Sequence, residues 1–177
     1  MKRLFTLLFA IALLGQYTFA QTDEIPVKDG KVVFTQTIET SMSAEEIHDS
    51  LTTWLGEHIE GIGTVNADNE EQNMIVCRFS ELTLIQEHTL MVFELFVNYT
   101  AIFEYKDKEC LVTVKNISYI EPEDKNGKET PTIFSAEKVL LEKEYKRIFI
   151  KDAVGKIAHA TSEKMNNFFK NIDNILD

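Results

Sequence analysis

An alternation of apolar and polar residues between positions 91 and 105 limits the possible folds most strongly. Side chains along a β-strand point to opposite faces in turn, so apolar residues at every second position share one face. A helix would spread them around its axis. The pattern therefore predicts one long strand with a buried face made of Met91, Phe93, Leu95, Val97, Tyr99, Ala101, Phe103 and Tyr105.

Segments 74–85 and 110–120 flank this strand and are also rich in β-branched and aromatic residues. Short polar breaks separate the three segments, which is typical of an antiparallel meander. An earlier segment, 31–40, alternates in the same way and predicts a further strand, whereas the polar, acidic stretch 64–73 is expected to form a loop or a hairpin edge. The sequence thus predicts an antiparallel sheet of four to five strands.

A helix is expected between the first strand and the meander. Ser43 and Glu46 form a capping box, in which each side chain satisfies a free backbone N–H group at a helix start. An apolar stripe at steps of three and four residues follows, and it should face the sheet: Ile47, Leu51, Trp54, Leu55 and Ile59.

The C-terminal region, from Ala136 onward, has helical periodicity through Tyr145, Ile148 and Phe149 to the chain end. Gly155 weakens it, which favours a short helix followed by a longer one. Strand, helix, meander and helices in this order predict an α+β domain with its helices on one sheet face.

The N-terminus has the features of a secretory signal peptide. Lys2 and Arg3 precede an apolar run, 4–14, which is too short to span a membrane, and Ala20 ends a small-residue cleavage motif. We therefore divide the chain into a signal peptide, 1–20, and a single domain, 21–177. The mature protein is expected in the periplasm or outside the cell, without a transmembrane segment.

The composition is acidic, with a formal net charge of −11. Loss of the leader, with its two positive charges, changes this value to −13. Nucleic-acid binding depends on clustered Lys and Arg that neutralise phosphates, and the sequence has no such cluster. Nucleic acid is therefore excluded as an expected partner.

These elements resemble a known family of exported domains of unknown function from Bacteroidetes-type bacteria, which have a TATA-binding-protein-like (TBP-like) fold. The resemblance depends on IPVKDGKVVFTQTIET followed by SAEEIHDSLTTWL, on the meander, and on SAEKVLLEKEYK. It implies a fold and assigns no catalytic or binding residue. The fold name suggests DNA binding, which the acidic charge contradicts.

We find no motif for catalysis, for a metal or for another cofactor. His48 and His58 are ten residues apart on one predicted helix, unlike the four-residue spacing of helical zinc ligands. His159 and Glu163 have that spacing but no evident third ligand. A G-x-S-x-G elbow, which would present a nucleophilic serine, is also absent from the sequence. The chain is therefore not expected to be an enzyme.

The two cysteines are expected to remain free despite export. A turn near residue 87 would place Cys77 opposite Val97, and a turn at 106–109 would place Cys110 opposite Tyr105. These positions on the middle strand would be about 26 Å apart at roughly 3.3 Å per residue. A disulfide requires α-carbons within about 7 Å.

The outward face of the middle strand is more apolar than a solvated face requires, and its candidate contact residues are Leu90, Val92, Phe96 and Ile102. The leading functional hypothesis is a non-enzymatic module that contacts a protein or the cell envelope through this face. One alternative is a carrier that holds a small apolar ligand between sheet and helix. The other is an enzyme whose residues converge only in three dimensions.

Signal cleavage is predicted after Ala20, so the mature chain should begin at Gln21. N-terminal sequencing of the protein from its own host checks this position. A membrane-bound product that still begins at Met1 would contradict the assignment to an exported compartment.

Overall fold

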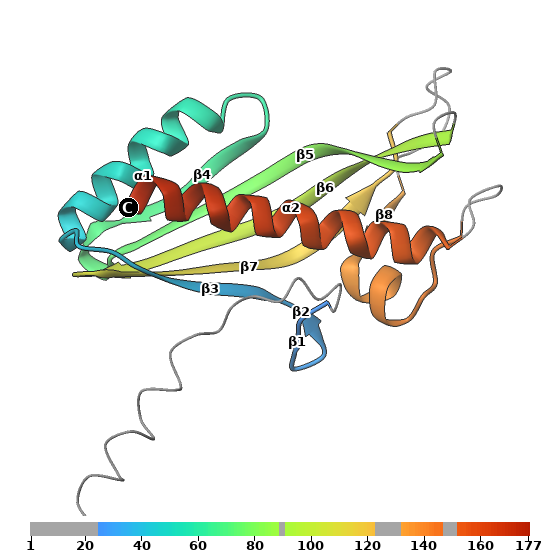
Figure 1. Cartoon of the computed structure of the whole chain (residues 1–177), viewed down its shortest axis with the longest axis horizontal. Coiled ribbons are helices and arrows are strands. Elements are labelled where there is room, and N and C mark those ends of the chain that lie inside the picture. Colours follow the sequence, from blue (N-terminus) through green and yellow to red (C-terminus); the bar gives the residue numbers. More distant parts are fainter. Residues whose placement is uncertain (1–24, 89–90, 123–131, 147–151) are drawn as a thin grey trace, which may run out of the picture.

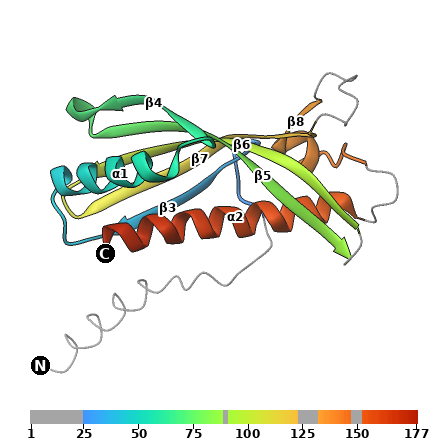
Figure 2. The same ribbon diagram turned by 90° about the horizontal axis from the view of Figure 1, so that it is seen from above.

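The computed structural model describes residues 25–88, 91–122, 132–146 and 152–177. The predicted signal peptide lies outside these residues, so the division at residue 20 stays a prediction. The described part forms a curved antiparallel sheet with α1 (Ala44–His58) and α2 (Ala153–Leu176) on the same side of it (Figures 1 and 2). Neither of these helices is both long and apolar enough to cross a membrane.

The main sheet has the strand order β3-β7-β6-β5-β4, with β8 paired to β7 as a sixth strand. All pairings in it are antiparallel. The strands are β3 (Phe34–Glu39), β4 (Gly63–Asn69), β5 (Met74–His88), β6 (Met91–Lys106), β7 (Glu109–Ile120) and β8 (Ile133–Ser135). The predicted α+β class, with helices on one face of an antiparallel sheet, is confirmed.

The central strand β6 has the buried face that the alternation at residues 91–105 predicted. Its inward residues from Phe93 to Tyr105 are all buried, with exposed fractions of 6% or less. They contact the helices on one side, while Glu94 and Glu104 on the other side are exposed. The burial of this face restricts the register of the three long strands, which shifts at irregularities between Gln86 and His88 and between Asn98 and Thr100.

The polar stretch 64–73, expected to form a loop or a hairpin edge, forms a hairpin edge. Its first part is β4, which pairs with β5 at the margin of the sheet, and a short 3-10 helix, Glu70–Gln72, follows. Asn69 caps this helix and Asn73 ends it in the left-handed conformation, with φ of 48°. Because β4 is exposed along most of its length, its sequence carries no apolar alternation.

The expected first strand is divided in two. Val27–Lys28 (β1) and Lys31–Val32 (β2) form a separate ribbon whose turn, at Asp29 and Gly30, has positive φ at both residues. Only β3 joins the main sheet.

The first helix begins at the predicted cap. The Ser43 backbone N–H donates to Glu46 Oε2 at 2.7 Å, and the Glu46 N–H donates to Ser43 Oγ. The Ser43 hydroxyl also donates to Glu46 Oε2, and the two hydrogen bonds from Ser43, backbone first, lower the pKa of the Glu46 carboxyl group. Ile47, Leu51 and Leu55 are fully buried, as expected, but Trp54 is only partly buried.

A short helix does precede a longer one at the C-terminus. The short one is a π-helix, η2 (Glu137–Leu141), and the long one is α2. Gly155 lies in the first turn of α2 and not between the helices, beside the carboxylate of the capping residue Asp152. Tyr145 is buried but lies outside any helix, contrary to our expectation. Ile148 and Phe149 lie outside the described residues.

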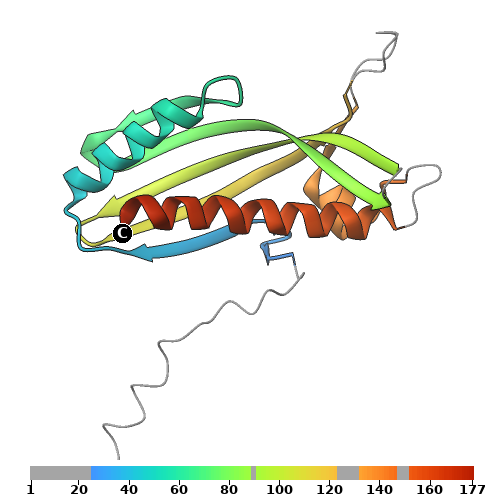
Figure 3. The ribbon, with the colours of Figure 1, turned by 45° about the horizontal axis from the view of Figure 1, so that its top comes forward.

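A buried hydrogen-bond chain joins α2 to the sheet. The Tyr119 hydroxyl on β7 lies 2.9 Å from Thr161 Oγ1, which donates to the Ile157 carbonyl oxygen at 2.7 Å. Tyr119 is therefore the donor to Thr161. Burial, the main cause, raises the pKa of Tyr119. This chain connects α2 to β7, and α2 lies along the length of the sheet (Figure 3).

Both cysteines are free and buried. Cys110 lies opposite Tyr105, as predicted, but Cys77 lies opposite Ala101 and not Val97. The β5–β6 register places the hairpin turn two residues later than we expected. The paired positions are then about 13 Å apart along β6, with a strand between the cysteines, which is still too far for a disulfide.

Two thiols per chain are predicted to react with a thiol reagent only after unfolding. Burial raises the pKa of both Cys77 and Cys110 to about 12, so the reactive thiolate is scarce at neutral pH. Titration of native and denatured protein without reductant measures this difference. A count near zero in denatured monomer would show that the cysteines are paired.

Candidate functional site

A cavity of about 350 Å³ lies between the helices and the inner face of the sheet. Its walls come from the end of α1, the middle of α2, and strands β5 and β6. It is lined by Trp54, His58, Ile62, Phe79, Glu81, Thr83, Leu84, Tyr99, Ala160, Glu163, Lys164, Asn167, Phe168 and Asn171. We refer to it as the helix–sheet cavity.

Aromatic rings form one side of the helix–sheet cavity. Phe79 and Tyr99, from neighbouring strands, are stacked with their centroids 5.0 Å apart. Phe168 on α2 meets each of them edge to face at 5.7 Å. Such offset and edge-on contacts are the preferred geometries of aromatic pairs, so this wall is apolar and well ordered.

A polar group interrupts the aromatic wall. Lys164 Nζ on α2 donates to Glu81 Oε2 on β5 at 2.6 Å, and the Tyr99 hydroxyl donates to Glu81 Oε1. The two charged side chains are only 17% and 24% exposed. Burial and then the Glu81 charge raise the pKa of Tyr99, so its hydroxyl stays protonated and remains a donor.

Trp54 and His58 lie at the mouth of the cavity. Their rings are stacked with centroids 5.1 Å apart, and Trp54 also meets Phe168 edge to face at 6.1 Å. His58 Nδ1 lies 3.0 Å from the Trp54 carbonyl oxygen and therefore carries a proton. The same two side chains, with Asn171, continue into an open groove between the outer sides of α1 and α2.

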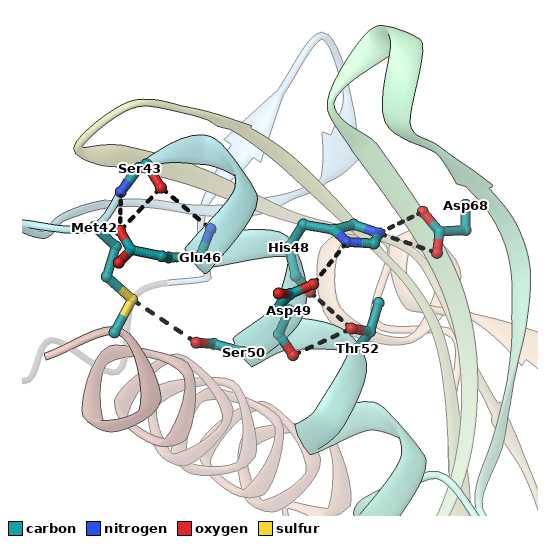
Figure 4. Close-up of polar contacts among 8 residues, drawn as sticks. All are labelled: Met42, Ser43, Glu46, His48, Asp49, Ser50, Thr52 and Asp68. Atoms are coloured by element: carbon teal, nitrogen blue, oxygen red, sulfur yellow. Dashed lines mark hydrogen bonds and ion pairs between the residues drawn. The ribbon is translucent and has the colours of Figure 1, made fainter.

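The histidines considered as metal ligands do not converge. His48 lies between Asp49 and Asp68, with Nε2 3.1 Å from Asp68 Oδ1, and so links α1 to the edge strand β4 (Figure 4). His58 contacts Trp54, and His159 is exposed on α2. Across the described ranges, no three His, Cys, Asp or Glu side chains are grouped to hold a metal ion.

The predicted contact residues are distributed as follows. Leu90 lies outside the described residues, as does the side chain of Val92, although its backbone belongs to β6. Phe96 and Ile102 point to the sheet face opposite the helices and are partly buried. This set does not belong to the helix–sheet cavity.

Phe96 is part of a longer apolar row. It lies opposite Leu82 on β5 and Ile120 on β7, and Ile120 lies opposite Ile133 on β8. Leu82 and Ile133 are 49% and 65% exposed. We call these four residues the outer row.

Sequence reasoning missed the polar members of the helix–sheet cavity. Glu81 follows Phe79 by two residues and so occupies an inward position of its strand. Lys164 lies four residues before Phe168, on the buried stripe of α2. The sequence did contain a signal for this pair, because Glu81 and Lys164 are charged residues at core-facing positions. A buried charge requires a partner, so each of them indicates a polar contact inside the domain.

The sheet topology and the helices on one face define a TBP-like α+β domain. Residues 34–120 match the model of the family described as "Domain of unknown function (DUF4468) with TBP-like fold". The chain thus carries a DUF4468 domain, which confirms the resemblance inferred from its sequence.

Two solved structures show the same fold. A DUF4468 family protein from Bacteroides ovatus ATCC 8483 superimposes with a TM-score of 0.70 and 20% identity, over 86% of this chain and 90% of its own. A TBP-like protein from Parabacteroides distasonis ATCC 8503 gives a TM-score of 0.70 and 17% identity, over 86% and 96%. Comparison with curated proteins gives no match.

Proposed function

We propose that this protein is a non-enzymatic module that binds a small, partly apolar molecule in the helix–sheet cavity. The observation that carries the proposal is an aromatic-walled cavity of about 350 Å³ with one polar group in its wall. Small-molecule sites usually measure about 300 to 1,000 Å³ and combine apolar walls with a few polar groups.

The contacts of the polar side chains support binding rather than catalysis. Both carboxylate oxygens of Glu81 already accept hydrogen bonds, from Lys164 and from Tyr99. A general base must lie within hydrogen-bond reach of the proton that it abstracts, and Glu81 is instead held by two donors of the cavity wall. We also assign the module to the exported fraction, on the strength of its signal-like leader.

The variant Ala160→Phe is predicted to abolish binding of a neutral apolar dye. Ala160 lines the helix–sheet cavity from α2, so a phenyl ring there would occupy its volume. Trp54 is the chain's single tryptophan and lies at the mouth, so its fluorescence reports occupancy. We expect Nile red to quench Trp54 in a saturable manner in wild type and not in the variant.

Ala158→Phe is the matched control, because Ala158 lies on the same helix but lines a different hollow beside Leu140 and Tyr145. It should bind the dye as wild type does. Equal binding by wild type and both variants would place the dye elsewhere and contradict the proposal. Native mass spectrometry of protein from its own host then shows whether a small molecule is retained.

A second candidate function is contact with another protein through the outer row. The leading hypothesis from the sequence was contact through this sheet face at Leu90, Val92, Phe96 and Ile102, of which Phe96 belongs to the outer row. The exposure of Leu82 and Ile133 favours contact through the outer row. Large apolar side chains adjacent on an uncovered sheet face are typical of interaction surfaces. Among the described elements, no helix lies on that face (Figure 2).

A photo-crosslinking residue at position 82 is predicted to capture one defined partner chain in the native host. The same residue at Lys170, which is exposed on α2 on the other side of the sheet, is the control. Electrophoresis and mass spectrometry identify the product. Crosslinks of equal yield from both positions, or none from position 82, would remove support for this candidate.

A further inference from the structure

We propose that the ligand of the helix–sheet cavity is a neutral, planar molecule with a carbonyl or similar acceptor oxygen that binds the Lys164 ammonium group. This inference rests on the proposed function and specifies the class of molecule. It follows from three properties of the cavity: its unused hydrogen-bond donors, the shape of its aromatic wall, and its balance of charge.

The donors of Lys164 exceed their partners. An ammonium group has three N–H donors, and Glu81 Oε2 is the one hydrogen-bond acceptor that Nζ contacts in the described part of the chain. The side chain is 17% exposed. Each Glu81 oxygen, in contrast, already accepts a hydrogen bond. Lys164 therefore offers two N–H donors that contact no acceptor in the described part of the chain, and a complementary ligand presents one.

The aromatic wall favours a flat molecule. Phe79 and Tyr99 are stacked at an interplanar angle of 19°, and Phe168 closes one side of the pair edge-on. Trp54 and His58 present a second stacked pair at the mouth, with an interplanar angle of 18°. A planar ring can lie against either pair in the offset or edge-on geometry that aromatic groups prefer. The volume of about 350 Å³ limits the ligand to a small ring system.

The charge balance favours a neutral molecule. The Lys164 charge is already compensated by Glu81, and the remaining ionisable groups of the lining are His58, Glu163 and the protonated Tyr99. An anion would find no uncompensated cation and would approach a chain with a net charge of −11. Beside the Glu81–Lys164 pair, a cation would lie against the Lys164 ammonium group. An uncharged acceptor avoids both costs.

Three aromatic dyes test these properties: Nile red is neutral and has a ring carbonyl, pyrene is neutral without an acceptor, and 8-anilinonaphthalene-1-sulfonate is an anion. Quenching of Trp54 gives each dissociation constant. We expect Nile red to bind at least about tenfold more tightly than the other two, because a hydrogen bond to a charged donor typically contributes at least that factor.

The double variant Glu81→Gln/Lys164→Met removes the donor without leaving an unpaired charge, and the Gln oxygen can still accept from Tyr99. Nile red should bind about 10- to 100-fold more weakly to it, while pyrene should bind as before. Lys170→Met is the control for the loss of a positive charge on α2, and it should leave all three constants unchanged. Thermal unfolding followed by circular dichroism verifies that each variant is folded.

The outcomes distinguish the inference from the proposed function. If Nile red is displaced by Ala160→Phe but binds the double variant as it binds wild type, the carbonyl–lysine contact is wrong and the cavity remains a binding site. Tighter binding of the anionic dye, lost in the double variant, would overturn the assignment of a neutral ligand. If no dye binds in a manner sensitive to Ala160→Phe, the proposed function itself fails.

Discussion

The contact of Phe168 with the inner face of the sheet is the interaction on which the rest of the structure depends. Its ring centroid lies within 6.2 Å of the rings of Phe79, Tyr99, Phe103 and Trp54, which belong to two strands and to α1. One side chain of α2 thus joins the sheet and the first helix. Edge-on contacts of this kind contribute about 0.5 to 1.5 kcal/mol each beyond the burial of apolar area.

The helix–sheet cavity follows from where the neighbouring elements end. The β4 ladder covers β5 only from Met74 to Phe79, and α1 ends at His58. Beyond these points α2 is the helix that lines the cavity beside β5, so the layer there has fewer side chains to fill it. Glu81 lies just past the last β4 pair, where its carboxylate meets Lys164 across this space. The cavity is therefore a product of unequal element lengths, which local sequence patterns do not encode.

Residue patterns predicted the elements whose side chains repeat with a clear period. Alternation identified β6, and the capping box placed the start of α1 at Ser43. Residue patterns were less informative where burial is uneven. The strand β4 is exposed and has no alternation, and Trp54, which the helical pattern assigned to the core, lines the cavity. The Cys77 partner was displaced because hairpin register depends on turn geometry, which the residues near 87 do not specify. Prediction of the cavity from sequence would have required the contact between Glu81 and Lys164, which are 83 residues apart.

The Glu81–Lys164 pair is difficult to explain by stability alone. Burying two charges has a desolvation cost that their attraction often does not exceed, and replacing such a pair by apolar residues is frequently neutral or stabilising. The surrounding wall is aromatic, so apolar side chains at both positions would extend the existing packing of Phe79 and Phe168. Tyr99, whose hydroxyl stays protonated, further fixes the Glu81 carboxylate and through it the Lys164 ammonium. A cation held in place by its counter-ion, with two of its donors directed to no acceptor in the described residues, is the arrangement expected of a binding site for an acceptor.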